Sequence, residues 1–114
     1  MSNASFAAYV GDPDFHDGSI ITVEHKDGMA RVRIRGASGK VFMVVFTGVF
    51  AVRANCPMDM VLFALSELQG QPPMRRFVFA NWDYDSKAFL EIDAESFSVL
   101  EDQHSCSGES TTQY

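Results

Sequence analysis

Three arginines at alternate positions have the clearest capacity for recognition chemistry in this sequence. Arg31, Arg33 and Arg35 are separated by single apolar residues. In a β-strand this spacing places the side chains on one face, about 6.5–7 Å apart. A guanidinium group makes paired hydrogen bonds with a carboxylate or a phosphate. The pattern therefore fits a surface that grips an acidic partner, and it also fits a solvated sheet face on which Glu24 pairs with Arg31.

A second group of polar residues lies in the turn from Asp12 to Asp17. Asp12, Asp14 and Asp17 supply three carboxylates, and His16 supplies an imidazole. The spacing does not match a calcium-binding loop, because Asp17 stands where such a loop needs glycine. The segment predicts either a polar turn or a small-ligand or metal site. We retain His16 and Asp17 as candidate ligand-binding residues.

Two aromatic residues, Trp82 and Tyr84, alternate with Asp83 and Asp85 in a third segment. Exposed aromatics beside carboxylates are typical of a recognition loop, although a loop tryptophan also commonly folds back over the core. No GxSxG, SxxK, HExxH, CxxC or glycine-rich phosphate motif occurs in the sequence. We therefore predict no catalytic residue, no metal ligand and no cofactor.

The excess of acidic residues argues against some classes of binding partner. The chain carries 15 acidic and 9 basic residues, a formal net charge of −6. Phosphate is repelled by such a protein at long range, so we expect no nucleic-acid partner. Cys56 and Cys106 form no CxxC pair, and no apolar run approaches the roughly 20 residues that span a bilayer. We expect reduced thiols, a cytoplasmic location and no membrane partner.

A β-hairpin is the strongest local structural prediction. Asp27-Gly28 is a two-residue type I′ turn signal between the apolar-alternating segments 19–26 and 29–36. A two-residue loop pairs Lys26 with Met29 and, further along, Ile21 with Ile34. One face of the hairpin is then apolar and the other polar, and both segments place their apolar residues on the same face. The arginines lie on the polar face. The predicted apolar face consists of Ile21, Val23, Ala30, Val32 and Ile34, with His25 at its end.

The rest of the sequence predicts further strands and one helix. Gly48 indicates a bulge or a sharp bend. Met58–Leu68 has apolar residues at helical spacing after Pro57, which favours a helix, with a short apolar strand as the alternative. The additional predicted strands are 40–46, 49–53, 76–81, 88–93 and 96–100. The predicted fold class is α+β and mainly antiparallel β, a strongly bent or half-barrel sheet of about six strands with one short helix.

The sequence predicts one domain with an irregular N-terminal segment and a disordered tail. Residues 1–18 show no sustained period, residues 19–102 form a single β-rich domain, and residues 103–114 are small, polar and expected to be disordered. One helix covers little of a sheet, and the segments 77–79 and 89–90 carry little charge to guard an edge. We therefore expect a homodimer, formed by edge pairing or through an apolar patch.

Two short strings resemble a known group of proteins. Phe15-His-Asp-Gly18, with Ile20 and Val23 after it, and Leu90-Glu-Ile-Asp-Ala94 are similar to segments of small uncharacterised bacterial β-domain proteins, some grouped with immunity proteins of toxin systems. The resemblance covers about a fifth of the chain and implies a non-enzymatic role with a protein partner. The alternatives are a small-ligand or metal-binding domain that uses the Asp12–Asp17 turn, and a small hydrolytic or acid–base enzyme.

Overall fold

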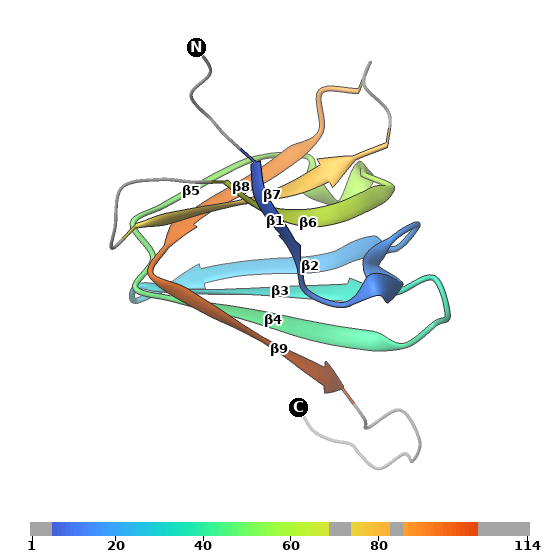
Figure 1. Ribbon diagram of the computed structural model, residues 1–114, viewed down its shortest axis with the longest axis horizontal. Helices are drawn as coiled ribbons and strands as arrows, with labels where there is room; N and C mark the ends of the chain where they lie inside the picture. The colour runs from blue at the N-terminus through green and yellow to red at the C-terminus, as the bar shows by residue number, and fades with distance from the viewer. Residues whose placement is uncertain (1–5, 69–73, 83–85, 103–114) are drawn as a thin grey trace.

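Within residues 6–68, 74–82 and 86–102, which are those that the structure describes, nine strands form two antiparallel sheets (Figure 1). In this computed structural model the larger sheet has the strand order β1-β6-β7-β8-β5, and the smaller sheet has the order β2-β3-β4-β9. The strands are β1 Phe6–Val10, β2 Ser19–Lys26, β3 Met29–Arg35, β4 Val41–Thr47, β5 Ala51–Asn55, β6 Leu62–Leu68, β7 Arg75–Asn81, β8 Phe89–Ala94 and β9 Ser96–Asp102. Two short 3-10 turns, η1 Pro13–Phe15 and η2 Pro57–Asp59, join them.

The β2–β3 hairpin confirms the predicted turn and most of its register. Asp27 and Gly28 both have positive φ, 56° and 75°, as a type I′ turn requires. Pairing runs as predicted from Lys26↔Met29 to Thr22↔Arg33. The ladder then shifts at a bulge, so that Ile20 rather than Ile21 pairs with Ile34 and is buried. The prediction for Ile21 was wrong because a bulge inserts one extra residue, which reverses the alternation beyond it.

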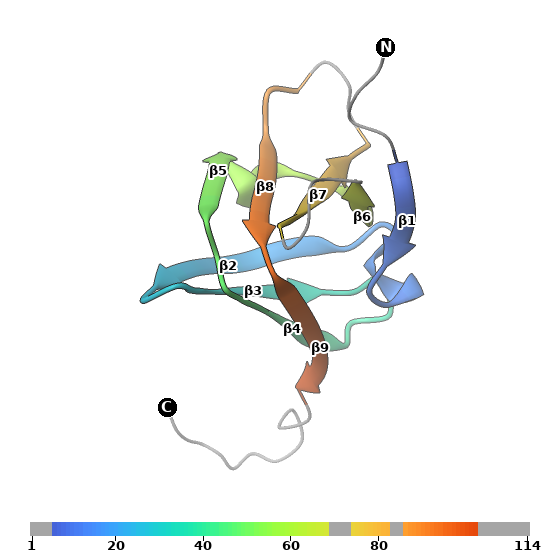
Figure 2. The ribbon, with the colours of Figure 1, turned by 60° about the vertical axis from the view of Figure 1, so that its left-hand side comes forward.

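The two sheets are joined by strands that turn a corner. Gly48, with φ of 63°, lies between β4 in the smaller sheet and β5 in the larger one, where the sequence predicts a bend. At the second corner only Glu95 separates β8 from β9, and Figure 2 shows β8 running on into β9 from one sheet to the other. The Glu95 amide donates to the carbonyl oxygens of Thr47 at 3.1 Å and Gly48 at 3.2 Å, which holds the corners together. The chain thus forms two packed sheets in place of the predicted single bent sheet.

The helix predicted over 58–68 is wrong. The segment begins with η2 and continues as β6, which pairs with β1 on one side and β7 on the other. A bulge between Leu62 and Ala64 lets Leu62 and Leu65, three residues apart, both face the core. A bulged strand therefore reproduces the spacing of a helical face. Among the described residues the only helical turns are η1 and η2, so the fold is mainly antiparallel β without the predicted α-helix.

Apolar side chains from both sheets fill the space between them. The fully buried large side chains are Phe15, Phe46, Phe77, Phe79, Ile34, Met60, Leu62, Leu65, Leu90, Ile92, Val32 and Val44. Phe15 enters this core from η1, whose position is set by the Asp14 carbonyl and carboxylate, which accept hydrogen bonds from Ala37 and Ser38. No helix in the described part of the chain is long and apolar enough to cross a membrane.

Two further sequence-based expectations change in the structure. The segment 1–18, predicted to be irregular, contributes β1, which pairs with β6 at the edge of the larger sheet. The strands expected to expose apolar edges, β7 and β8, lie inside that sheet, and Phe77, Phe79 and Leu90 are buried. That argument for a homodimer therefore fails, and the homodimer itself stays a prediction.

Candidate functional site

The three arginines predicted to form a recognition surface lie on the outer face of the smaller sheet. Ala30, Val32 and Ile34 alternate with them along β3 and are completely buried. Arg31, Arg33 and Arg35 therefore project away from the core, with Arg31 and Arg35 exposed and Arg33 partly exposed. Because β3 is flanked by β2 and β4, the guanidinium groups stand in the middle of the sheet rather than at its edge.

An aliphatic column runs beside these arginines, and the sequence analysis did not identify it. The β3–β4 register places Arg31 beside Val45, Arg33 beside Met43 and Arg35 beside Val41. On the next strand Leu100 pairs with Met43, and 56% of its surface is exposed. We call this surface the Arg–aliphatic face, and it consists of Arg31, Arg33, Arg35, Val41, Met43, Val45 and Leu100.

The predicted pair of Arg31 and Glu24 occupies one end of the face. The two side chains approach to 3.8 Å, and both are more than half exposed. A pair of this kind contributes about 0–1 kcal/mol, because water screens it on every side. Glu24 is therefore a weak competitor for the Arg31 guanidinium, which stays accessible to a stronger carboxylate partner.

A second candidate surface, the aromatic cluster, consists of Tyr9, His16, Phe63 and Trp82. The rings of Phe63 and Trp82 meet edge to face with centroids 5.0 Å apart, and His16 lies 5.3 Å from Trp82. Tyr9 contacts Phe63 at 5.9 Å. The His16 Nδ1 donates to the Phe63 carbonyl oxygen at 3.2 Å, which fixes the imidazole ring. The structure thus brings together two predicted residues, His16 and Trp82, that are far apart in sequence.

A hollow of about 330 Å³ adjoins the aromatic cluster. Its walls come from the end of β1, the turn around η1 and the bulged part of β6. Tyr9, His16, Phe63 and Asp12 are among the residues that line it. Asp12 Oδ1 also accepts a hydrogen bond of 2.8 Å from the Asp14 amide, so this carboxylate is held in place.

The other predicted site residues do not converge. Asp17 approaches His16 Nε2 only to 3.9 Å, with both side chains at least half exposed. Asp14 turns toward Ser38 and accepts from its hydroxyl at 2.6 Å. Among the described residues no three His, Cys, Asp or Glu side chains lie close enough to hold a metal ion. Tyr84 lies outside the described residues. Arg31, Arg33 and Arg35 are on the other sheet from β7, the strand that Trp82 follows.

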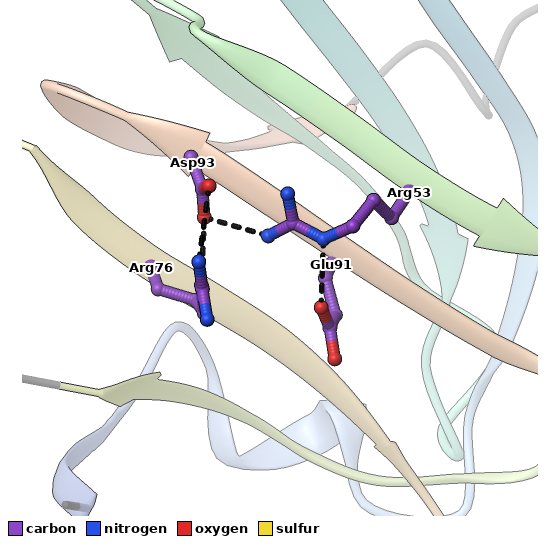
Figure 3. A network of polar contacts seen from close by, with 4 residues as sticks. All are labelled: Arg53, Arg76, Glu91 and Asp93. Atoms are coloured by element: carbon purple, nitrogen blue, oxygen red, sulfur yellow. Dashed lines mark hydrogen bonds and ion pairs between the residues drawn. The ribbon is translucent and has the colours of Figure 1, made fainter. Parts of the chain in front are cut away.

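A polar network on the outer face of the larger sheet was not predicted from the sequence (Figure 3). Asp93 Oδ1 accepts hydrogen bonds of 2.9 Å from both Arg53 and Arg76, and Arg53 Nε also donates to Glu91 at 3.0 Å. Burial alone would raise the pKa of Asp93, but the hydrogen bonds from Arg76 and Arg53 lower it below its usual value. The alternation of Glu91 and Asp93 along β8 is typical of a strand with one polar face. Their arginine partners lie on other strands, so the sequence of β8 does not predict the network.

A second ion pair, between Arg75 and Glu67, packs against two aromatic rings. Arg75 donates to both carboxylate oxygens of Glu67, at 2.8 and 2.9 Å. Its guanidinium lies 5.2 Å from the centroid of the Phe77 ring and 5.7 Å from that of Phe97. The hydrogen bonds from Arg75 lower the pKa of Glu67, although burial opposes them. In both networks the charged groups pair with one another within the chain, so we interpret them as stabilising the fold.

Comparison with protein-family models, with curated proteins and with solved structures found no match. The two strings that carry the resemblance to immunity proteins fall largely on core positions: Phe15, Ile20, Leu90 and Ile92 are all buried. Packing accounts for these residues without a shared function. Two surfaces therefore carry the candidate functions, the Arg–aliphatic face and the hollow beside the aromatic cluster.

Proposed function

We propose that this chain is a non-enzymatic protein-interaction module that binds an acidic segment of a partner protein through the Arg–aliphatic face. One observation carries the proposal: three guanidinium groups stand in a row on β3, next to a row of aliphatic side chains on β4. A surface of this kind presents charge for specificity and apolar area for affinity.

The geometry of the face suggests the form of its partner. Arg31, Arg33 and Arg35 alternate on one strand, so their spacing equals that of carboxylates at alternate positions of an extended peptide. Apolar residues beside those carboxylates would cover Met43 and the exposed Leu100. The preferred partner segment is therefore extended, acidic on one side and apolar on the other.

The charge of the chain favours a protein partner over a nucleic acid. A formal net charge of −6 repels a polyphosphate at long range, although three local arginines attract a single carboxylate-rich segment. The aliphatic column offers no hydrogen bonds to a sugar–phosphate backbone. Both features favour side chains that combine carboxylate and apolar character.

The acid–base enzyme alternative has weaker support in the geometry. It depends on His16 and Asp17, which are 3.9 Å apart and at least half exposed. A general acid or base works best when its environment tunes it and when substrate-positioning groups surround it. The Arg–aliphatic face combines more groups of matching chemistry than this pair does.

Comparative affinity capture from the native host tests the proposal. The bait proteins are the unmodified chain, a double variant R31Q/R35Q and a control K40Q/K87Q, which removes the same two charges from exposed lysines outside the face. We expect a protein partner that the control retains and the arginine variant loses, with binding weakened about tenfold or more, since hydrogen bonds to charged groups contribute about 1.5–3 kcal/mol each. Circular dichroism establishes that both variants are folded.

Two results would overturn the proposal. One is a partner held equally by the unmodified chain and by R31Q/R35Q, which would place binding elsewhere on the molecule. The other is recovery of nucleic acid rather than protein in an arginine-dependent manner. A Met43→Ser variant adds a second measurement, because it leaves every charge in place and removes part of the aliphatic column.

A further inference from the structure

Strand β2 borders the arginine row on the side opposite the aliphatic column. Each arginine has one cross-strand neighbour on β2, and the pairs are Glu24–Arg31, Thr22–Arg33 and Ser19–Arg35. Of these three neighbours only Glu24 is charged. One end of the row therefore has a carboxylate of the chain itself beside it, where the proposed partner would place a carboxylate of its own.

The contact between Glu24 and Arg31 is an ion pair at a distance longer than a hydrogen bond. Arg31 Nη1 and Glu24 Oε1 are 3.8 Å apart, beyond the roughly 2.7–3.2 Å of a hydrogen bond. In the ion pair of Arg75 and Glu67, by contrast, hydrogen bonds of 2.8 and 2.9 Å fix the guanidinium. Attraction between exposed charges holds Glu24 in place, so a ligand that offers Arg31 paired hydrogen bonds displaces it.

Lys26 offers Glu24 a second cationic partner. It lies two residues further along β2, so it projects from the same outer face of the smaller sheet. Glu24, Lys26 and Arg31 are among the residues that line a hollow of about 800 Å³ at the turn end of the hairpin. Residues two apart on a strand are separated by about 6.5–7 Å, a distance that long exposed side chains bridge. The Glu24 carboxylate can thus turn from Arg31 to Lys26.

We infer that Glu24 is an internal competitor for the arginine row: it pairs with Arg31 in the free chain and turns to Lys26 when the acidic segment of the partner binds. This inference rests on the proposed function, because it concerns how the partner reaches the Arg–aliphatic face. Binding exchanges the Glu24–Arg31 pair for two pairs, partner–Arg31 and Glu24–Lys26. Repulsion between Glu24 and the incoming carboxylate remains, so the contact at Arg31 is weaker than it would be beside a neutral residue.

Such a competitor favours ligands that contact several arginines at once. A single carboxylate at Arg31 gains little, since it replaces an attraction that already exists in the free chain. A segment that also reaches Arg35 gains a contact there without this competition, because the β2 neighbour of Arg35 is the uncharged Ser19. Glu24 therefore selects extended segments with several alternate carboxylates over isolated acidic groups.

Fluorescence anisotropy with a defined probe tests the inference. The probe is a fluorescein-labelled peptide in which three aspartates alternate with three leucines. The full chain is titrated at physiological ionic strength, where charges more than about 8 Å away are largely screened. We expect Glu24→Gln to bind the probe about twofold to fivefold more tightly than the unmodified chain. Glu101→Gln is the matched control and should leave binding unchanged, because Glu101 is exposed on β9, pairs with the buried Phe42 and so projects from the other face of the sheet.

Further variants test whether Glu24 acts through Arg31 and Lys26. In the background of Arg31→Gln the gain from E24Q should disappear, because Glu24 then has no guanidinium to occupy. Lys26→Gln should weaken binding about twofold in the chain that carries Glu24 and by a smaller factor in E24Q, where no displaced carboxylate needs Lys26. Circular dichroism establishes that each variant is folded.

The outcomes distinguish this inference from the proposed function. Probe binding that R31Q/R35Q leaves unchanged, or no binding of the probe at all, would overturn the proposed function and this inference with it. Binding that R31Q/R35Q weakens but E24Q leaves unchanged would overturn the role of Glu24 alone. An equal gain in E24Q and E101Q would assign the effect to net charge. An equal loss from K26Q with and without Glu24 would overturn the exchange to Lys26.

Discussion

The Nε atom of Arg76 donates a hydrogen bond of 2.9 Å to Oδ1 of Asp93, which is its cross-strand neighbour on β8. From the other side of β8, Arg53 donates to the same oxygen at 2.9 Å. The Asp93 side chain is only 8% exposed, whereas both arginines reach water. A desolvated carboxylate is tolerated here because two guanidinium groups neutralise it. Asp93 thereby connects β5, β8 and β7 across the outer face of the larger sheet.

Replacing Asp93 should destabilise the fold more than replacing its neighbour Glu91. In Asp93→Asn the shape is kept, but two charge-assisted hydrogen bonds lose their acceptor charge at a buried position. We expect the free energy of unfolding, measured by urea denaturation at neutral pH, to fall by about 1–3 kcal/mol. Glu91→Gln is the matched control, because Glu91 is one-third exposed and is hydrogen-bonded to Arg53, so its loss should be below about 1 kcal/mol. Equal losses would contradict this assignment.

The same carboxylates predict how stability depends on pH. The pKa values of Asp93 and Glu67 are lowered in the folded chain, so the folded state binds fewer protons than the unfolded state in acid. Their contribution to stability is then complete above the unfolded values of about 3.9 and 4.3, and it is lost as the pH falls through the lower folded values. Urea denaturation between pH 7 and pH 2 should show stability falling below about pH 4. In the double variant E67Q/D93N this part of the decrease should be absent, and an unchanged pH profile would contradict the prediction.

Local sequence signals predicted the β2–β3 hairpin. Where a bulge disturbs the spacing of apolar residues, the sequence predicted the wrong type of element or the wrong face. Asp27-Gly28 specifies its own turn, and the alternation on both sides specifies its register within a few residues. Over 58–68 a bulge in β6 places Leu62 and Leu65 on one face, and the resulting spacing imitates a helix. At Ile21 a second bulge reverses the alternation. A bulge is an interaction between two strands, so the sequence of one strand does not reveal it.

The candidate sites were predicted only as far as they lie within one strand. The Arg31–Arg35 row depends on alternation along β3 and was recognised as a surface. Its aliphatic neighbours on β4 require the β3–β4 register, and the aromatic cluster requires His16 and Trp82 to meet across two segments. The Arg53–Asp93–Arg76 network needs three strands. Each of these depends on long-range pairing, which neither spacing nor composition specifies.

The turn of the hairpin offers a direct test of its conformation. Gly28 has φ of 75°, a region that a β-branched residue enters only with strain, and a Cβ added there would lie in open space. Gly28→Val should therefore destabilise through the backbone alone, by about 1–2 kcal/mol. Thr22→Val introduces the same side chain at an exposed, extended position of β2 and should have little effect. Thermal denaturation compares the two variants, and an unchanged melting temperature in the Gly28 variant would argue against the type I′ turn.

A homodimer is the final prediction, now with a different structural basis. The ends of the two sheets are β1, β5, β2 and β9, and an edge strand presents backbone groups that pair readily with a second strand. On β9, Leu100 is 56% exposed and Ser96 and Ser98 carry no charge. Antiparallel pairing of β9 with the same strand of a second copy satisfies two-fold symmetry and joins the Arg–aliphatic faces of both copies into one continuous surface.

Light scattering at micromolar concentration measures this association directly. We expect a mass of twice the 12.7 kDa of the single chain. Leu100→Lys places a charge on the β9 edge, the device by which natural sheets prevent edge pairing, and should shift the mass to that of the monomer. Met58→Lys makes the same change at a comparably exposed residue on η2, 52% against 56%, and should leave the dimer intact. A monomeric unmodified chain would contradict the homodimer, and a dimer that persists in L100K would place its interface away from β9.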